Sequence, residues 1–370
     1  MTSPTARPRR PVATAALLAA SVLVGFAVLE AAFRLARVPV GTVQINRATI
    51  RRSPNPRLRY ELRPGAVASA EVTYRVNAAG LRGPEVADQK RPGTLRVAVL
   101  GDSIAFGYWV ADEAAFPRQL ERLLAGGPGG RPVEVLNFGV PGYNLEQATE
   151  VLRARALAFA PDVVVVSLCL NDLESDMSYE YGLTLDRSAR RARLAGRLFD
   201  ALLGHSRLLA WIEYRLAERE ARRQFVRARN PMPGPLYAEA VSQQREALRA
   251  RFGTIAALLR DAGGVPGLVA VFPTFGERFD RYPHRALHEA AREAARHAGL
   301  AAVDLLECFR AYDFRAARVD VVHPSPLGHR VAAHAIAEAL CASKLVCPAL
   351  PLPHACTAYR PADFAVVRGY

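Results

Sequence analysis

The stretch Leu-Arg-Val-Ala-Val-Leu-Gly-Asp-Ser at residues 95–103 is the one from which the fold of the chain can be worked out. Its first six residues form a largely apolar run of strand length, and a glycine then ends the run just before a serine. Open α/β sheets bind ligands at the carboxyl edge of their strands. Ser103 is therefore a candidate nucleophile, although a Gly-Asp-Ser sequence on its own is more often an ordinary turn.

Four more short apolar runs follow this stretch, and helical segments separate them. The five expected strands are 95–100, 133–138, 163–170, 267–272 and 301–306. The expected helices are 117–124, 145–158, 237–262, 284–297 and 326–341. Strands that alternate with helices are typical of a parallel sheet wrapped by helices. We therefore predict an α/β fold, a three-layer α/β/α domain with a parallel sheet of about five strands.

The chain divides into four regions on this interpretation. We expect an anchor at 1–37, a polar lead-in at 38–92, the catalytic domain at 93–345 and a tail at 346–370. Alternating polar and apolar residues at 71–76 predict a strand in the lead-in, which we expect to cover an edge of the domain.

The gap between the third and fourth expected strands is too long for a simple crossover and predicts a helical insertion at 173–235. Five apolar residues of this insertion fall on one helical face among many arginines: Leu198, Leu202, Leu209, Ile212 and Leu216. Such a helix can lie on a lipid surface, roof an active site, or simply pack on the sheet as a solvated helix. The sequence does not choose between these three placements.

An apolar run from about 11 to 29 predicts a membrane-spanning helix at the amino terminus. Arg7, Arg9 and Arg10 precede the run and favour an amino terminus inside the cell, although Arg34 and Arg37 on the far side weaken the asymmetry. We expect a single-pass protein of the bacterial membrane whose catalytic part lies outside the cytoplasm. A cleaved signal peptide is the alternative, but the run is long for one and lacks a good cleavage site.

The formal charge of +14 raises the question of nucleic-acid binding. Lys90 and Lys344 are the only lysines among 49 basic residues, which leaves 49 − 2 = 47 arginines scattered along the chain. This pattern is typical of codon bias in a GC-rich genome, and no nucleic-acid-binding motif accompanies it. We therefore expect no nucleic-acid partner.

Cysteine positions point to an oxidising compartment. Cys341, Cys347 and Cys356 crowd the carboxyl-terminal part, where two of them can pair, and the sequence does not say which two. Cys169 and Cys308 lie in apolar segments and are expected to be buried small side chains, not reactive thiols. None of the spacings is typical of a zinc site.

Asp320-Val-Val-His323 is the second stretch with catalytic potential, since it lies between the fifth expected strand and the last helix. A serine nucleophile needs a base within hydrogen-bond reach and a group that orients this base. Two intervening residues allow Asp320 to fold back and hold His323 in the tautomer that faces Ser103. Alternatively, Asp320 caps a turn and His323 only starts the helix. His329 is a weaker candidate base, because its expected helical position turns it away from the loop.

Gly139 and Asn171 follow the second and third expected strands and offer hydrogen-bond donors. The backbone N–H of a glycine can approach a substrate closely, and an Asn side chain provides another N–H. Together with the Ser103 amide they form a candidate oxyanion hole. Each segment taken alone is more often a loop than a catalytic element.

The four candidate segments, taken in chain order, resemble the four sequence blocks of the SGNH hydrolases, also called GDSL esterases and lipases. These segments are Gly101-Asp102-Ser103, Gly139, Asn171 and Asp320-x-x-His323. The resemblance covers about 95–340. It implies a flavodoxin-like domain, a Ser103-His323-Asp320 triad, and an oxyanion hole made by Ser103, Gly139 and Asn171, with no metal or organic cofactor.

The chain departs from the SGNH pattern at Ile104, where the family name implies Leu, and at Cys169, where a glycine is usual. The second departure puts the backbone next to Asn171 in doubt. The lead-in at 76–85 also resembles a segment found in membrane-anchored bacterial relatives.

The resemblance implies a serine esterase that acts through an acyl-enzyme on an acylated carbohydrate or lipid. An acyltransferase acting on envelope polysaccharide is the nearest alternative, since the first half-reaction is shared. A non-catalytic envelope scaffold is the third, and the intact set of motif residues argues against it. The sequence does not define the acyl group, the alcohol or the oligomeric state.

Overall fold

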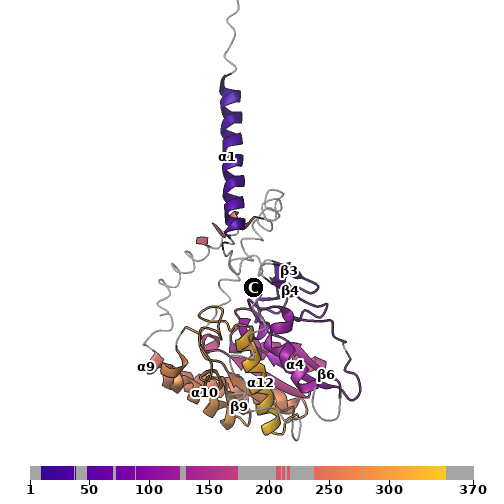
Figure 1. Cartoon of the computed structure of the whole chain (residues 1–370). Coiled ribbons are helices and arrows are strands. Elements are labelled where there is room, and N and C mark those ends of the chain that lie inside the picture. Colours follow the sequence, from indigo (N-terminus) through magenta and orange to yellow (C-terminus); the bar gives the residue numbers. More distant parts are fainter. Residues whose placement is uncertain are drawn as a thin grey trace, which may run out of the picture.

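The computed structural model describes residues 10–36, 38, 48–69, 72–87, 89–125, 131–173, 206–209, 211–212, 215–216, 237–276 and 278–346. A central sheet lies among helices, and a long single helix extends away from it at the amino end (Figure 1). All but the first residue of the predicted tail at 346–370, and most of the predicted insertion at 173–235, lie outside the described residues.

The central sheet contains five parallel strands in the order β6-β5-β7-β8-β9. The strands are β5 (Leu95–Leu100), β6 (Val133–Asn137), β7 (Val163–Leu168), β8 (Gly267–Val271) and β9 (Ala301–Asp304). All residues of β5, β7 and β8 are buried, as expected for parallel strands covered on both faces. If the five strands are numbered in chain order, they lie side by side in the order 2-1-3-4-5, which is the order of flavodoxin-like sheets. In such sheets the ligand crevice lies at the carboxyl ends of the first and third strands, here β5 and β7.

The helices form two packed groups around this sheet. They are α3 (Ser103–Phe106), α4 (Phe116–Ala125), α5 (Leu145–Ala154), α9 (Tyr237–Asp261), α10 (Arg285–His297), α11 (Leu305–Phe309) and α12 (Pro326–Ala342). α4 packs against α12, and α9 packs against both α5 and α10. Ser325 caps α12 by accepting the N–H of Gly328 at 3.2 Å, and Pro326 occupies its first turn, where a missing N–H costs nothing.

The predicted fold class is confirmed, and all five predicted strands begin at the residue where the structure begins them. The strand ends are predicted one or two residues too late in β6 to β9, because buried apolar residues such as Phe138 and Leu170 continue past the last ladder hydrogen bond. The helix predicted at 145–158 is interrupted: α5 ends at Ala154, and the 3₁₀ turn Ala156–Phe159 follows.

The lead-in contains two small antiparallel pairs. β1 (Ile50–Arg52) pairs with β2 (Tyr60–Leu62), and β3 (Val67–Ser69) pairs with β4 (Thr73–Arg75). The strand predicted at 71–76 corresponds to β4, whereas β1 to β3 were not predicted. An antiparallel bridge between Arg82 and Asn137 joins the lead-in to β6, which is an edge strand of the central sheet.

The amino-terminal helix α1 runs from Arg10 to Leu35 and stands apart from the sheet (Figure 1). Its stretch Ala13–Leu35 has a mean hydropathy of 2.2, and none of that stretch is buried within the protein. A helix of this length and composition is long and apolar enough to cross a membrane.

Cys169 is buried with a free thiol, in agreement with the prediction. Cys308 is also buried, but it is disulfide-bonded, and this the sequence did not predict. Cys341 is disulfide-bonded as well. The two other cysteines of the expected pairing, Cys347 and Cys356, lie outside the described residues.

Candidate active site

Ser103 begins the short helix α3 directly after β5. The carboxylate of Asp102 caps this helix by accepting the N–H of Ile104 at 2.8 Å. Gly101 has a φ of +154°, and a Cβ at this position would lie 2.9 Å from the nearest neighbouring atoms. The turn from strand to helix therefore requires glycine, and it places Ser103 at the carboxyl edge of the sheet with 7% of its surface exposed.

The imidazole of His323 lies between Ser103 and Asp320. Its Nε2 is 2.9 Å from Ser103 Oγ, and its Nδ1 is 2.8 Å and 3.0 Å from the two carboxylate oxygens of Asp320. A proton on Nδ1, held by the carboxylate, leaves Nε2 as the acceptor for the serine proton. The structure therefore brings the three residues together in the order that activates a serine hydroxyl.

Asp320 is fixed by its own loop, which precedes α12. Its Oδ1 accepts the backbone N–H groups of Val322 and His323, both at 2.8 Å. Partial burial raises the pKa of Asp320, but the hydrogen bond and charge of His323 and these backbone N–H groups outweigh it and lower the pKa to about 2. The carboxylate is therefore ionised at neutral pH.

Asn171 and Gly139 reach the same edge from the strands on either side of β5. The Nδ2 of Asn171 lies 3.4 Å from Asp102 Oδ2, in the residue next to Ser103. Gly139 packs directly on α3, since a Cβ there would lie 2.3 Å from the backbone nitrogen of Phe106. Its N–H donates to Asn137 Oδ1 at 2.9 Å, so this donor already has an internal partner.

Two buried carboxyl groups, those of Asp102 and Asp172, belong to the turns that carry Ser103 and Asn171. Burial raises the pKa of Asp102, and it raises the pKa of Asp172 well above its usual value, with the charge of Asp102 adding to the effect. Asp172 Oδ2 accepts the N–H of Cys169 at 2.8 Å, which closes the turn that carries Asn171. A side chain thus stabilises this turn, so the turn forms with cysteine at the position where the resemblance implies glycine.

A comparison with protein-family models matches residues 99–331 to the GDSL-like lipase/acylhydrolase family. The chain belongs to this family. The match spans the segments that carry Ser103, Gly139, Asn171, Asp320 and His323, and the resemblance stated from the sequence is confirmed. The protein is therefore an ester-hydrolysing enzyme.

Three solved structures illustrate what this hydrolase is similar to. An α/β hydrolase from the metagenome of Lake Arreo is 16% identical, with a TM-score of 0.41 over 66% of this chain and 94% of that chain. The acetylxylan esterase of Geobacillus stearothermophilus is 16% identical, with a TM-score of 0.40 over 66% and 94%. The lipase/acylhydrolase of Enterococcus faecalis is 17% identical, with a TM-score of 0.39 over 67% and 96%. A comparison with curated proteins finds no match.

Trp109 also contacts the candidate site of this hydrolase, and sequence reasoning missed it. Its indole Nε1 donates to Asp320 Oδ2 at 3.0 Å. Its backbone φ of +65° is uncommon for a bulky residue, and its N–H donates to the hydroxyl of Tyr74 at 2.9 Å. Such strain persists where surrounding contacts enforce it, and here the lead-in strand β4 supplies one of them. The only sequence signal was an indole donor six residues after Ser103.

The lead-in also places a buried arginine beneath this loop. The guanidinium of Arg82 donates to carbonyl oxygens at the end of α3 and to that of Val110 at 2.7 Å, and it pairs with Asp112 at 2.8 Å. It lies over the rings of Tyr74 and Phe106, 4.7 Å and 4.8 Å from their centroids. The lead-in therefore supports α3, the helix that Ser103 begins, in addition to covering an edge of the sheet.

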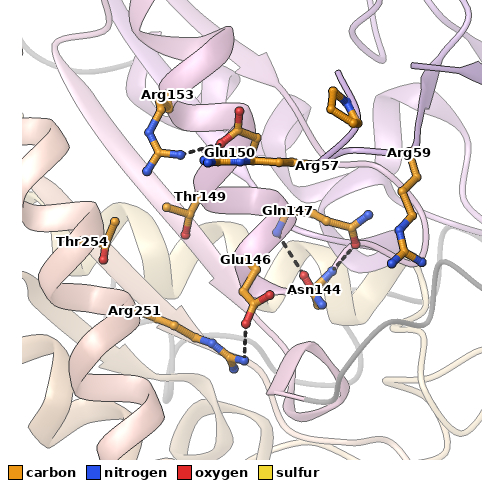
Figure 2. A pocket seen from close by; sticks show the side chains of 11 residues that line it. Arg57, Arg59, Asn144, Glu146, Gln147, Thr149, Glu150, Arg153, Arg251 and Thr254 are labelled. Carbon is orange, nitrogen blue, oxygen red and sulfur yellow. Dashed lines mark hydrogen bonds and ion pairs between the residues drawn. The ribbon is translucent and has the colours of Figure 1, made fainter. Parts of the chain in front are cut away.

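A cavity of about 510 Å³ lies beside the start of α5 (Figure 2). Its charged lining consists of Arg57, Arg59, Arg153, Arg251, Glu146 and Glu150. Arg251 pairs with Glu146 at 2.8 Å, and Glu150 pairs with both Arg57 and Arg153. None of the candidate catalytic residues lines this cavity, so we do not place the ester there. Figure 2 also shows the reciprocal hydrogen bonds of Asn144 and Gln147 that fix the start of α5.

His329 does not approach Ser103 in the structure. It is fully buried in α12, its Nδ1 accepts the N–H of Phe116 at 3.2 Å, and its Nε2 has no partner among the described residues. Burial, with a smaller contribution from the charge of Arg82, lowers its pKa to about 3. The neutral, enclosed ring has a structural role. This agrees with the sequence analysis, in which His329 was a weaker candidate base than His323.

This histidine makes the fold sensitive to acid. Between pH 6.5 and about 3 the unfolded chain binds a proton at residue 329 that the folded chain does not bind, so stability falls as the pH falls. One such proton corresponds to about 1.4 kcal/mol per pH unit. His329→Gln is expected to flatten the pH dependence of the melting temperature below pH 6.5. His297→Gln, at an exposed end of α10, is the control, and equal slopes in wild type and His329→Gln would contradict this account.

Proposed function

We propose that the protein is a serine esterase in which Ser103 is the nucleophile, His323 the general base and Asp320 the residue that orients the base. The observation that carries this proposal is the single hydrogen-bonded chain from Asp320 through both nitrogens of His323 to Ser103 Oγ. The low pKa of Asp320 supports its part, because an ionised carboxylate stabilises the imidazolium that forms when the serine proton moves.

The proposed reaction has two half-reactions. Ser103 Oγ attacks the ester carbonyl while its proton passes to His323 Nε2, and the tetrahedral intermediate collapses as His323 returns the proton to the departing alcohol. A water molecule then attacks the acyl-enzyme, again losing a proton to His323, and the carboxylic acid is released with Ser103 restored. The donors proposed for the oxyanion are the N–H groups of Ser103 and Gly139 and the Nδ2 of Asn171. In this scheme the Gly139 N–H is shared with Asn137 or released by it when the substrate binds.

We further propose that α1 anchors the enzyme in the bacterial membrane as a single span, with the catalytic part outside the cytoplasm. The arginines that precede α1 support this orientation, and the disulfide-bonded Cys308 and Cys341 support an oxidising compartment. The proposed organisation keeps the anchor at 1–37, the lead-in at 38–92, the hydrolase domain at 93–345 and the tail at 346–370.

The proposed substrate is an acylated carbohydrate or lipid of the cell envelope. The experiment is hydrolysis of p-nitrophenyl esters of increasing acyl length by the full chain in detergent, with and without an added oligosaccharide acceptor. Hydrolysis of short esters is expected for a deacetylase and of long esters for a lipase. Acyl transfer to the oligosaccharide in preference to water would favour the acyltransferase, and the absence of any turnover by folded protein would favour the scaffold.

Trp109 has a positioning role in this proposal, since its indole N–H restrains the carboxylate of Asp320. A hydrogen bond to a charged group contributes about 1.5–3 kcal/mol, but Asp320 keeps its bonds from the backbone and from His323 when the indole is lost. Trp109→Phe is therefore expected to lower kcat by roughly tenfold with little change in KM. Trp211→Phe changes the only other tryptophan and is the matched control. Equal kcat for Trp109→Phe and wild type would remove Trp109 from the site.

A further inference from the structure

The apolar stretch of α1 ends at a residue that has an unexpected set of partners. Between Arg10 and Glu30 the helix carries no charged side chain, and these 19 residues are close to the roughly 20 needed to cross the hydrocarbon core. On the proposed span, Glu30 lies at the end of this uncharged stretch, on the side of the catalytic domain. A carboxylate at this depth needs hydrogen-bond partners, because the bilayer provides few.

Arg34 of the same helix provides one of these partners at 2.7 Å, and a part of the insertion provides the others. Glu30 accepts hydrogen bonds from Ser206 Oγ at 2.8 Å and from the backbone N–H groups of Arg207 and Leu208 at 3.1 Å and 3.0 Å. Ser206 and Leu208 are each only 7% exposed. The carboxylate thus caps the start of a helical segment, where backbone N–H groups lack partners of their own.

We call the described residues 206–209, 211–212 and 215–216 the docking segment; it is helical at 207–209, 211–212 and 215–216. Trp211 meets Phe33 of α1 edge to face, with ring centroids 5.4 Å apart. Arg207 Nη1 donates to the carbonyl oxygen of Val38 at 3.3 Å. The docking segment therefore follows the anchor from Glu30 toward the catalytic domain.

The docking segment exposes two large apolar side chains. Ile212 is 39% and Leu216 is 52% exposed, and Leu35 near the end of α1 is 86% exposed. The guanidinium of Arg215 lies 6.0 Å from the ring centroid of Trp211. A tryptophan, an arginine and exposed aliphatic side chains on one amphipathic segment are typical of a protein surface in the headgroup region of a bilayer.

We propose that the docking segment lies in the interfacial layer of the membrane, that its occupant is lipid contacting Ile212 and Leu216, and that Glu30 holds it there. The inference rests on the proposed membrane span of α1. It adds a second segment, from the insertion, that contacts the surface of the membrane next to this span. Of the three placements that the sequence left open for this amphipathic stretch, the contacts with α1 favour the lipid surface. The consequence is that part of the insertion between β7 and α9 is tied to the membrane.

The depth of Trp211 in the bilayer tests this proposal. The chain contains two tryptophans, so Trp109→Phe leaves Trp211 as the only tryptophan, and excitation at the red edge of the absorption band selects its emission over that of the tyrosines. The full chain is placed in vesicles of phosphatidylcholine and phosphatidylglycerol whose acyl chains carry bromine either near the headgroup or near the tail end. Bromine near the headgroup is expected to reduce emission about twofold or more, and bromine at the tail end much less, as for interfacial tryptophans. Emission that responds to neither bromolipid, but to iodide in the water, would overturn the proposal.

Two variants test the role of Glu30 in the same vesicles. Glu30→Gln changes the acceptor of the cap and Ser206→Ala removes one of its donors. Both variants are expected to lower the quenching by bromine near the headgroup. Arg34→Gln removes the Glu30 ion pair on the same helix and leaves all three cap donors and the carboxylate that accepts from them in place, so it is expected to leave quenching unchanged. If all three variants match their parent, Glu30 does not hold the segment. Two further measurements separate the docking inference from the proposals on which it rests. Resistance of the protein to extraction by alkaline carbonate tests the membrane span, and ester turnover tests the proposed function. Both results can be positive while the docking inference fails.

Discussion

Ser103→Ala is expected to abolish ester hydrolysis, with kcat falling by about a millionfold toward the uncatalysed rate. Without Oγ no acyl-enzyme forms, and a water molecule that takes the place of the hydroxyl is not held in position to attack the bound ester, although His323 remains. His323→Ala is expected to cost about as much, because an unactivated hydroxyl is a weak nucleophile at neutral pH. The double variant is expected to be no slower than either single variant, since the two residues act as a unit.

The controls for this experiment are the same substitutions at exposed helix ends. Ser343→Ala lies at the carboxyl end of α12 and His297→Ala at that of α10, and both are expected to keep wild-type kcat. The assay uses p-nitrophenyl esters and protein whose folding is verified by circular dichroism. Substantial turnover by folded Ser103→Ala would contradict the assignment of the nucleophile. Additive losses in the double variant would contradict the view that Ser103 and His323 act together.

Gly139→Ala is expected to lower kcat by about a hundredfold or more, although it adds only a methyl group. The new Cβ would lie 2.3 Å from the nitrogen of Phe106 and 2.8 Å from the Cβ of Ala105, both in the helix that Ser103 begins. These are rigid parts of α3, so the helix must shift, and a shift of about 1 Å at the nucleophile is enough for such a loss. The N–H proposed for the oxyanion moves with it.

Gly253→Ala provides the matched control, because a Cβ at that position in α9 meets nothing within 4 Å. Replacing glycine inside a helix is expected to keep kcat and to raise stability by about 0.5–1 kcal/mol. Both variants are compared by kcat and melting temperature. Wild-type kcat in Gly139→Ala would show that α3 tolerates the displacement and that the close approach has no catalytic purpose.

The sequence predicted the central sheet well, because buried parallel strands appear as continuous apolar runs separated by amphipathic helices. The run at 163–168, four valines followed by Ser and Leu, is an example. The short pairs β1–β2 and β3–β4 were mostly missed, since strands of three residues contain too few positions for a period to appear. Cys308 was assigned as an isolated buried residue because a disulfide depends on distances that spacing does not provide.

The candidate site was predictable where chain order and strand ends determine position. Ser103, Asn171 and His323 each follow a predicted strand or precede a predicted helix, so topology brings them to one edge. Trp109 was not predictable, because its contact with Asp320 depends on a left-handed backbone that a bulky residue rarely adopts. For Gly139 the sequence suggested a donor, whereas the structure adds a packing requirement against α3.

The most direct test of the catalytic assignment is covalent labelling of the folded full chain with a fluorophosphonate probe, followed by mapping of the modified residue by mass spectrometry. The geometry at Ser103 and His323 predicts a single labelled serine, Ser103, and labelling that is slowed by several orders of magnitude in His323→Ala. Labelling of a different serine, or no labelling of folded wild-type protein, would contradict it.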